Sequence, residues 1–72
     1  MKKLDLHGEK HEESEFLVSV FIENNIDNLP IEIVTGNSGI MKNIVMKIVK
    51  KHNLKAYTKT DYNLGCLVIS NK

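Results

Sequence analysis

The chain has 72 residues and a mass of 8.2 kDa, with 42% hydrophobic and 26% charged residues. This is the size and composition of one small globular domain, and we expect residues 1–72 to form it. The single cysteine, Cys66, excludes an internal disulfide and a zinc site built on several cysteines. No apolar run is long enough to cross a bilayer or to resemble an export signal, so we expect a cytoplasmic protein with no membrane partner.

The charges are divided between the two parts of the chain. Residues 1–34 hold eight acids and three lysines, a net charge of −5, whereas residues 35–72 hold seven lysines and one acid, a net charge of +6. A field of lysines can neutralise phosphates and attract a polyanion, although a solvated helix face has the same composition. All cations are lysines, which disfavours the bidentate recognition that guanidinium groups provide.

The first half of the chain predicts a strand, a helix and a second strand. Residues 3–7 alternate polar and apolar side chains, which predicts a short half-buried strand that Gly8 ends. Residues 9–25 lack glycine and proline, begin with acids and repeat apolar residues at helical spacing, which favours a helix. Pro30 marks a turn, and the β-branched residues 31–34 then predict a second strand.

The second half predicts another helix and two more strands. After a loop at residues 35–39, apolar residues recur at i, i+4 and i+8 from Ile40, with lysines between them, which predicts an amphipathic helix that Asn53 can end. A third strand, a turn and a fourth strand follow at residues 54–60, 61–63 and 65–70.

This order, β-α-β-α-β-β, predicts an α/β (α+β) fold. We expect a two-layer sandwich with two helices on one face of a mixed four-stranded sheet. Helical crossovers make the first strands parallel, and the short final turn predicts an antiparallel hairpin.

Two side chains at the end of the first predicted strand are candidate catalytic residues. Asp5 and His7 lie at positions i and i+2, so both project to the same face of a strand. The carboxylate could orient the imidazole or hold a hydrated Mg²⁺ ion, and histidine is the natural acid or base at neutral pH. The alternative is an aspartate that caps the neighbouring loop and a histidine that bonds to the backbone.

The loop after the second predicted strand is a candidate phosphate site. Backbone N–H groups at such a strand-to-helix junction, together with the helix dipole, favour an anion. The spacing is that of neither a P-loop nor a dinucleotide fingerprint. Ligands gather beyond the carboxyl ends of parallel strands, so we expect a nucleic-acid backbone here. The candidate nucleic-acid-binding residues are Gly8, Thr35, Gly36, Asn37, Ser38, Gly39, Lys42, Lys47, Lys50 and Lys51.

The motifs in this order resemble those of the Smr (small MutS-related) domain family. Residues 4–8, Leu-Asp-Leu-His-Gly, match its opening signature, Thr35-Gly36 begins its loop motif, and residues 65–68 resemble its final strand. Ser38 stands where the second loop glycine of the family is usual, and Tyr62-Asn63 stands where a Gly-Gly pair often precedes the last glycine. The resemblance implies nicking of DNA or endonucleolytic cutting of RNA, with His7 as acid or base.

Other functions stay open at this point. Residues 36–39 also resemble the GXXG loop with which KH domains clamp a nucleic-acid backbone. A module that binds nucleic acid without cleaving it, or one that binds an acidic protein through its lysines, fits the same sequence. A second copy is a further candidate partner, through the uncovered sheet face that carries Val34 and Tyr57.

Overall fold

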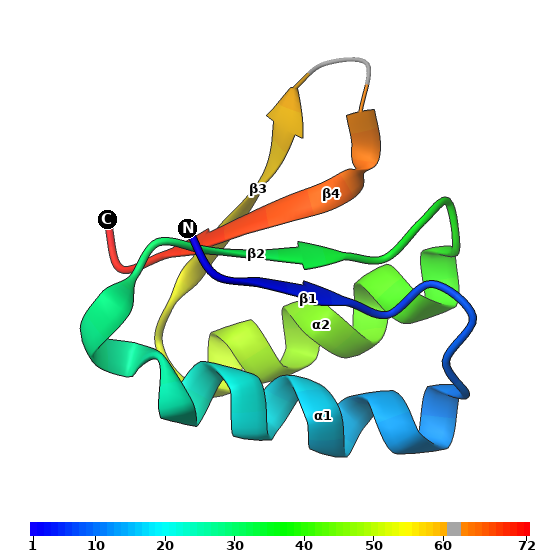
Figure 1. Cartoon of the computed structure of the whole chain (residues 1–72), viewed down its shortest axis with the longest axis horizontal. Coiled ribbons are helices and arrows are strands. Elements are labelled where there is room, and N and C mark those ends of the chain that lie inside the picture. Colours follow the sequence, from blue (N-terminus) through cyan, green and yellow to red (C-terminus); the bar gives the residue numbers. More distant parts are fainter. Residues whose placement is uncertain (61–62) are drawn as a thin grey trace.

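A mixed sheet of four strands forms one layer of the molecule, and two helices form the other (Figure 1). The computed structural model describes residues 1–60 and 63–72. The strands are β1 (Lys3–Asp5), β2 (Ile31–Val34), β3 (Lys55–Thr60) and β4 (Asn63–Ser70), in the spatial order β1-β2-β4-β3. The first two positions of the turn predicted at residues 61–63 lie outside the described residues.

The pairing confirms the predicted fold. β1 and β2 are parallel neighbours, and β4 runs antiparallel to both β2 and β3. β4 therefore occupies the position between β2 and β3, which the sequence pattern did not specify. The parallel pair brings the loops that leave β1 and β2 to the same edge of the sheet, at the right of Figure 1.

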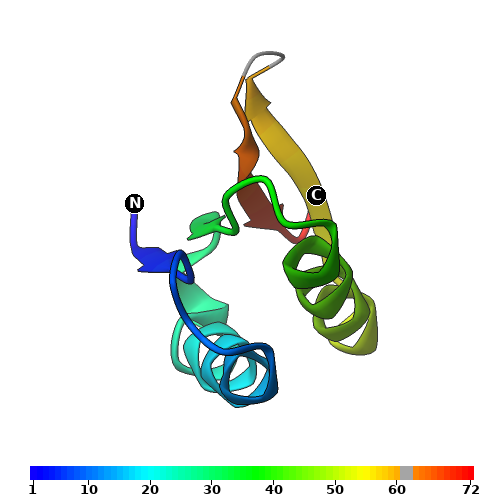
Figure 2. The ribbon, with the colours of Figure 1, turned by 90° about the vertical axis from the view of Figure 1, so that its right-hand side faces the viewer.

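The helices are α1 (His11–Asn24) and α2 (Gly39–Lys51), and both lie on the same face of the sheet (Figure 2). A short 3-10 helix, η1 (Ile26–Asn28), and a cis peptide bond between Leu29 and Pro30 lead from α1 into β2. None of the helices in the described part of the chain is long and apolar enough to cross a bilayer.

The end of α2 follows the prediction that Asn53 terminates it. Asn53 has a φ of 57°, the left-handed conformation that closes many helices. The N–H of Leu54 then donates to the carbonyl of Val49 at 3.0 Å, which satisfies one of the last helical acceptors. His52 joins this end through a 2.9 Å hydrogen bond between its Nδ1 and the carbonyl oxygen of Ile48.

The first predicted strand and helix are longer than the observed ones. β1 ends at Asp5, although the N–H of Leu6 still donates to the carbonyl of Val34 at 2.8 Å. The chain then turns at His7 and Gly8, where Gly8 has a φ of 85°. The helix predicted from residue 9 begins at His11, because residue 10 keeps an extended backbone.

The core lies between the sheet and the helices. Strand alternation turns one set of side chains toward the helices and the other set to the open face. The fully buried side chains of the inward set include Ile31 and Ile33 from β2 and Ile69 from β4. They pack against apolar side chains of both helices, namely Val18, Ile22, Met41, Val45, Ile48 and Val49.

Candidate nucleic-acid interface

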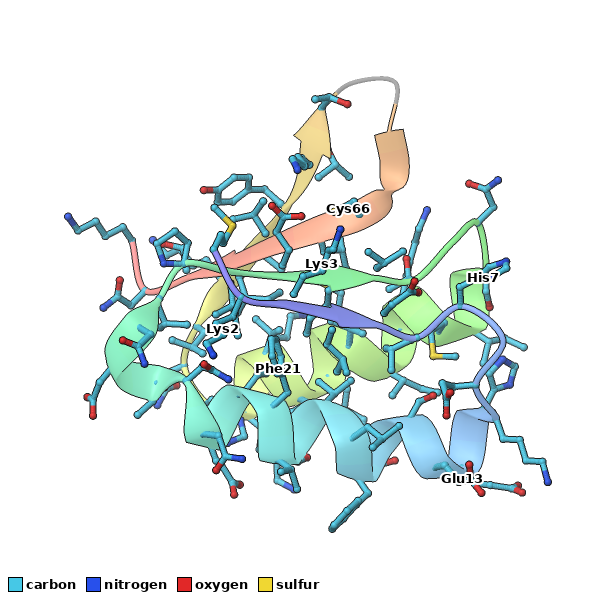
Figure 3. The ribbon with its side chains drawn as sticks, in the orientation of Figure 1. Lys2, Lys3, His7, Glu13, Phe21 and Cys66 are labelled. Atoms are coloured by element: carbon cyan, nitrogen blue, oxygen red, sulfur yellow. The ribbon has the colours of Figure 1, made fainter. Side chains whose placement is uncertain are left out.

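The two stretches predicted to form a site meet at one edge of the sheet. His7 follows β1 and Gly36 follows β2, and a Cβ atom built on Gly36 would lie 3.5 Å from Cδ2 of His7. Figure 3 shows His7 at this edge, beside the loop that leads into α2. The parallel pairing of β1 and β2 is the reason, because it aligns the carboxyl ends of the two strands. We call this region, residues 5–8 and 35–42, the loop edge.

Asp5 supports the main chain of the turn that presents His7. Its Oδ1 accepts a 2.9 Å hydrogen bond from the backbone N–H of His7. This is the local side-chain-to-backbone bond by which aspartate stabilises turns. The contact that the structure shows for this carboxylate is therefore with the backbone, as in the capping alternative. Gly8 completes the turn, since its positive φ is one that glycine adopts without strain.

Thr35 and Gly36 are held by Gly65, near the start of the neighbouring strand β4. Their backbone N–H groups both donate to the carbonyl oxygen of Gly65, at 2.8 and 3.2 Å. The hydroxyl of Thr35 lies 3.0 Å from the carbonyl oxygen of Gly36 and 3.3 Å from that of Gly65, and the residue is buried. These two predicted ligand residues therefore build the loop, and their N–H groups are already used within the protein.

Gly65 is a site-building residue that the sequence interpretation missed. A Cβ atom on Gly65 would lie 3.0 Å from the carbonyl carbon and oxygen of Gly36. Only glycine lets β4 approach the loop this closely without a shift of the backbone. The signal in the sequence is a glycine directly before an apolar strand, but that pattern does not name the segment that it touches.

The backbone at the start of α2 remains available to a ligand. Ser38 caps the helix, because its hydroxyl accepts a 3.1 Å hydrogen bond from the N–H of Met41. The N–H groups of residues 37–40 donate to no acceptor within the described part of the chain. Asn37, Gly39 and Ile40 are exposed, and the first turn of α2 contains no acid. Unpaired N–H groups and the positive end of the helix dipole there favour an anion.

The four lysines predicted to bind nucleic acid are spread along α2. Lys42 lies in the turn that follows the free N–H groups. Lys47 forms a 3.6 Å ion pair with Glu15 of α1. Lys50 and Lys51 lie in the last turn, roughly 16 to 18 Å along the helix from its first residue. The structure thus brings Lys42 to the loop edge and leaves the other three lysines farther along the helix.

The described residues hold no group of three or more His, Cys, Asp or Glu side chains that could bind a metal ion. Asp5 can offer one carboxylate oxygen beside the turn, since the other accepts from His7. Mg²⁺ is commonly held by one or two carboxylates together with water and substrate phosphate, so a single aspartate fits that ion as a substrate-dependent ligand.

A second polar cluster lies on the open face of the sheet, away from the helices. Nζ of Lys59 lies 3.1 Å from Oε1 of Glu32, and the thiol of Cys66 donates to Oε2 at 3.3 Å. The hydrogen bond from Lys59, and after it the one from Cys66, lowers the pKa of Glu32. The bond between Lys59 and Glu32 also raises the pKa of Lys59. Burial, together with the hydrogen bond to the Glu32 carboxylate, raises the pKa of the Cys66 thiol, so this cysteine is not activated as a nucleophile.

Comparisons of the chain with models of protein families, with curated proteins and with solved structures return no match. The resemblance to the Smr family therefore stays a prediction from the residues of the motifs.

Proposed function

We propose that this protein binds the phosphodiester backbone of DNA or RNA at the N-terminus of α2. The observation that carries the proposal is the set of N–H groups at residues 37–40, which have no acceptor within the described chain. They follow Gly36, beside which His7 lies, and precede Lys42 on α2. A phosphate there would accept hydrogen bonds from the backbone and interact with the helix dipole. The Smr-like motifs that supply His7 and Gly36 support the same interpretation.

Cleavage of the bound backbone is the second function that the site favours, because an imidazole lies against the phosphate loop. His7 would take a proton from an attacking water or give one to the departing oxygen as the P–O bond breaks. Lys42 is the cation nearest in sequence to the free N–H groups that could stabilise the developing charge. Mg²⁺ held by Asp5 and the phosphate would supply further charge stabilisation.

The two alternative functions, a KH-like clamp and a protein-binding module, would use different features of the structure. The loop of a KH domain joins two helices, whereas residues 35–38 join strand β2 to helix α2. A protein partner for the lysines would use the outer surface of α2 instead of the loop edge. The loop edge therefore distinguishes these hypotheses experimentally.

Binding is tested by fluorescence anisotropy with labelled single-stranded and double-stranded DNA and RNA at several salt concentrations. We expect Lys42→Glu to weaken binding and to reduce the slope of log K against log salt by about 1. Lys51→Glu is the matched control, because it makes the same charge change at the far end of α2. Equal effects of the two variants would contradict a site at the loop edge.

Cleavage is tested with supercoiled plasmid and structured RNA, with and without Mg²⁺. His7→Ala should abolish the activity. Asp5→Asn separates two roles, since the amide oxygen can still accept from the His7 N–H but is a much poorer Mg²⁺ ligand. Activity that survives in Asp5→Asn assigns Asp5 to the turn, and activity that survives in His7→Ala would contradict the proposed cleavage site.

A further inference from the structure

The open face of the sheet carries an exposed aromatic side chain at one end of a row that crosses all four strands. The paired residues of this row are Tyr57 of β3, Val68 of β4, Glu32 of β2 and Lys3 of β1. Their neighbours Ile33, Leu67 and Ile69 belong to the core, so alternation turns the row away from the helices. Tyr57 is 53% exposed, whereas Val68 beside it is buried.

The charges around Tyr57 suit a polyanion. Lys55 and Lys59 lie two residues to either side of Tyr57 on β3, and both are exposed. Lys3 points away from α1 on the opposite edge strand, toward the side on which Cys66 lies (Figure 3). The acid in the row, Glu32, is paired with Lys59, so these two charges offset each other and Lys55 and Lys3 supply the net positive charge around the row.

The row is continuous with the loop edge. Val68 and Gly65 are three residues apart on β4, a distance of about 10 Å. Gly65 binds the loop backbone directly through Thr35 and Gly36. Tyr57 lies one strand spacing, about 5 Å, to the side of Val68. A few nucleotides of one strand can span the distance from Tyr57 to the loop.

We propose that the open sheet face binds the bases of single-stranded nucleic acid, with one base stacked on Tyr57 and the following backbone directed to the N-terminus of α2. This inference rests on the proposed function and adds the strandedness of the ligand. Stacking on an aromatic side chain needs the face of an unpaired base, because a duplex keeps its base faces inside the stack. The ligand is therefore a flexible single strand of DNA or RNA and not a duplex.

The test is the affinity of the full chain for short labelled oligothymidine and oligouridine strands and for a duplex of the same length. Tyr57→Val keeps a good strand former but removes the aromatic face. We expect it to weaken binding of single strands about 5- to 100-fold, while Tyr57→Phe retains wild-type affinity. Phe16→Ala is the control, because Phe16 is the other strongly exposed aromatic residue of the described chain, 70% exposed, and it lies on the outer side of α1.

A spectroscopic measurement tests the stacking itself. The chain has no tryptophan and two tyrosines, so Tyr62→Phe leaves Tyr57 as the single tyrosine fluorophore. Saturation of this variant with oligothymidine should quench its tyrosine emission. Unchanged emission at saturation would overturn stacking on Tyr57.

The outcomes separate the two proposals. If neither strand nor duplex binds the wild-type protein, the proposed function and this inference both fail. If the wild type binds but Tyr57→Val binds equally well, or if Phe16→Ala loses as much affinity, the inference alone fails. A loss in Tyr57→Val that Tyr57→Phe does not share supports it, and the DNA and RNA strands then show which sugar the site prefers.

Discussion

The two junctions between a parallel strand and its helix occupy equivalent places in the fold but differ in chemistry. The first joins β1 to α1 through residues 6–10, and the second joins β2 to α2 through residues 35–38. α1 begins without a side-chain cap and has Glu12 and Glu13 in its first turn. α2 begins at a serine cap and has no acid in its first turn.

Because of this difference, we expect an anion to bind at the second junction and not at the first, although both occupy the same kind of place in the fold. The acids of α1, including Glu13 at the beginning of the helix in Figure 3, already complement the helix dipole and repel a phosphate. At α2 the dipole and the N–H groups of residues 37–40 face no acid of their own turn. The first junction contributes a side chain, His7, and the second contributes the backbone against which it lies.

The largest effect is expected from Gly65→Ala, which attacks the support of the second junction. The added methyl group would lie 3.0 Å from the backbone of Gly36, so the loop or β4 must move. We expect a loss of about 1 to 3 kcal/mol of stability, a fall in Tm of several degrees, and weaker nucleic-acid binding. Thermal unfolding followed by circular dichroism measures the effect.

Gly39→Ala is the control for this variant, because a Cβ atom at Gly39 meets nothing within 4 Å. Its stability should stay within about 0.5 kcal/mol of the wild type. A Gly65→Ala variant as stable as Gly39→Ala would contradict the close approach of β4 and the loop.

Ile40→Glu makes the second junction resemble the first. An acid in the first turn of α2 should weaken nucleic-acid binding about tenfold, equivalent to about 1.4 kcal/mol. The same acid should stabilise the helix by about 0.3 to 1 kcal/mol. Ile40→Gln is the uncharged control, and Ile40 is exposed, so neither change disturbs the core. Affinity and stability that fall together would contradict the electrostatic explanation.

The difference in capping between the two helices can also be tested, by removing the cap of α2 and adding one to α1. Ser38→Ala removes the acceptor of the Met41 N–H and should cost about 1 kcal/mol. Lys10→Asp gives α1 the acceptor that it lacks, at a residue whose backbone is already extended, and should gain about 0.5 to 1 kcal/mol. Urea unfolding measures both. Effects of the same sign would show that the two junctions do not differ in capping.

The smallest effect on stability is expected from the ion pair between Glu32 and Lys59, which lies outside both junctions. The pKa of Glu32 is lowered from its ordinary value of 4.5, so its contribution is present above that pH and is lost as the pH falls through the lowered pKa. Glu32→Gln removes this contribution. The Tm difference from the wild type should be largest near neutral pH and should narrow in acid. A constant difference across this range would contradict the role of the carboxylate charge.

The local signals in the sequence predicted most of the fold. Helical periodicity predicted both helices, β-branched and alternating residues predicted the strands, and Asn53 marked the end of α2 as the structure has it. The short β1 was predicted too long, because alternation continues through His7 while the backbone already turns there. Sequence motifs also indicated that His7 and the loop from residue 35 belong to one region.

The sequence by itself determined the helices, the strands and the parallel first pair, since these follow from short-range spacing, turn residues and the handedness of crossovers. The tertiary structure decided that β4 lies between β2 and β3 and that the carbonyl oxygen of Gly65 accepts hydrogen bonds from the N–H groups of Thr35 and Gly36. Thr35 and Gly65 are 30 positions apart and are joined through backbone atoms, and such contacts leave no periodic pattern in the chain. Which N–H groups of the loop keep no acceptor in the described chain was therefore visible only in the folded protein.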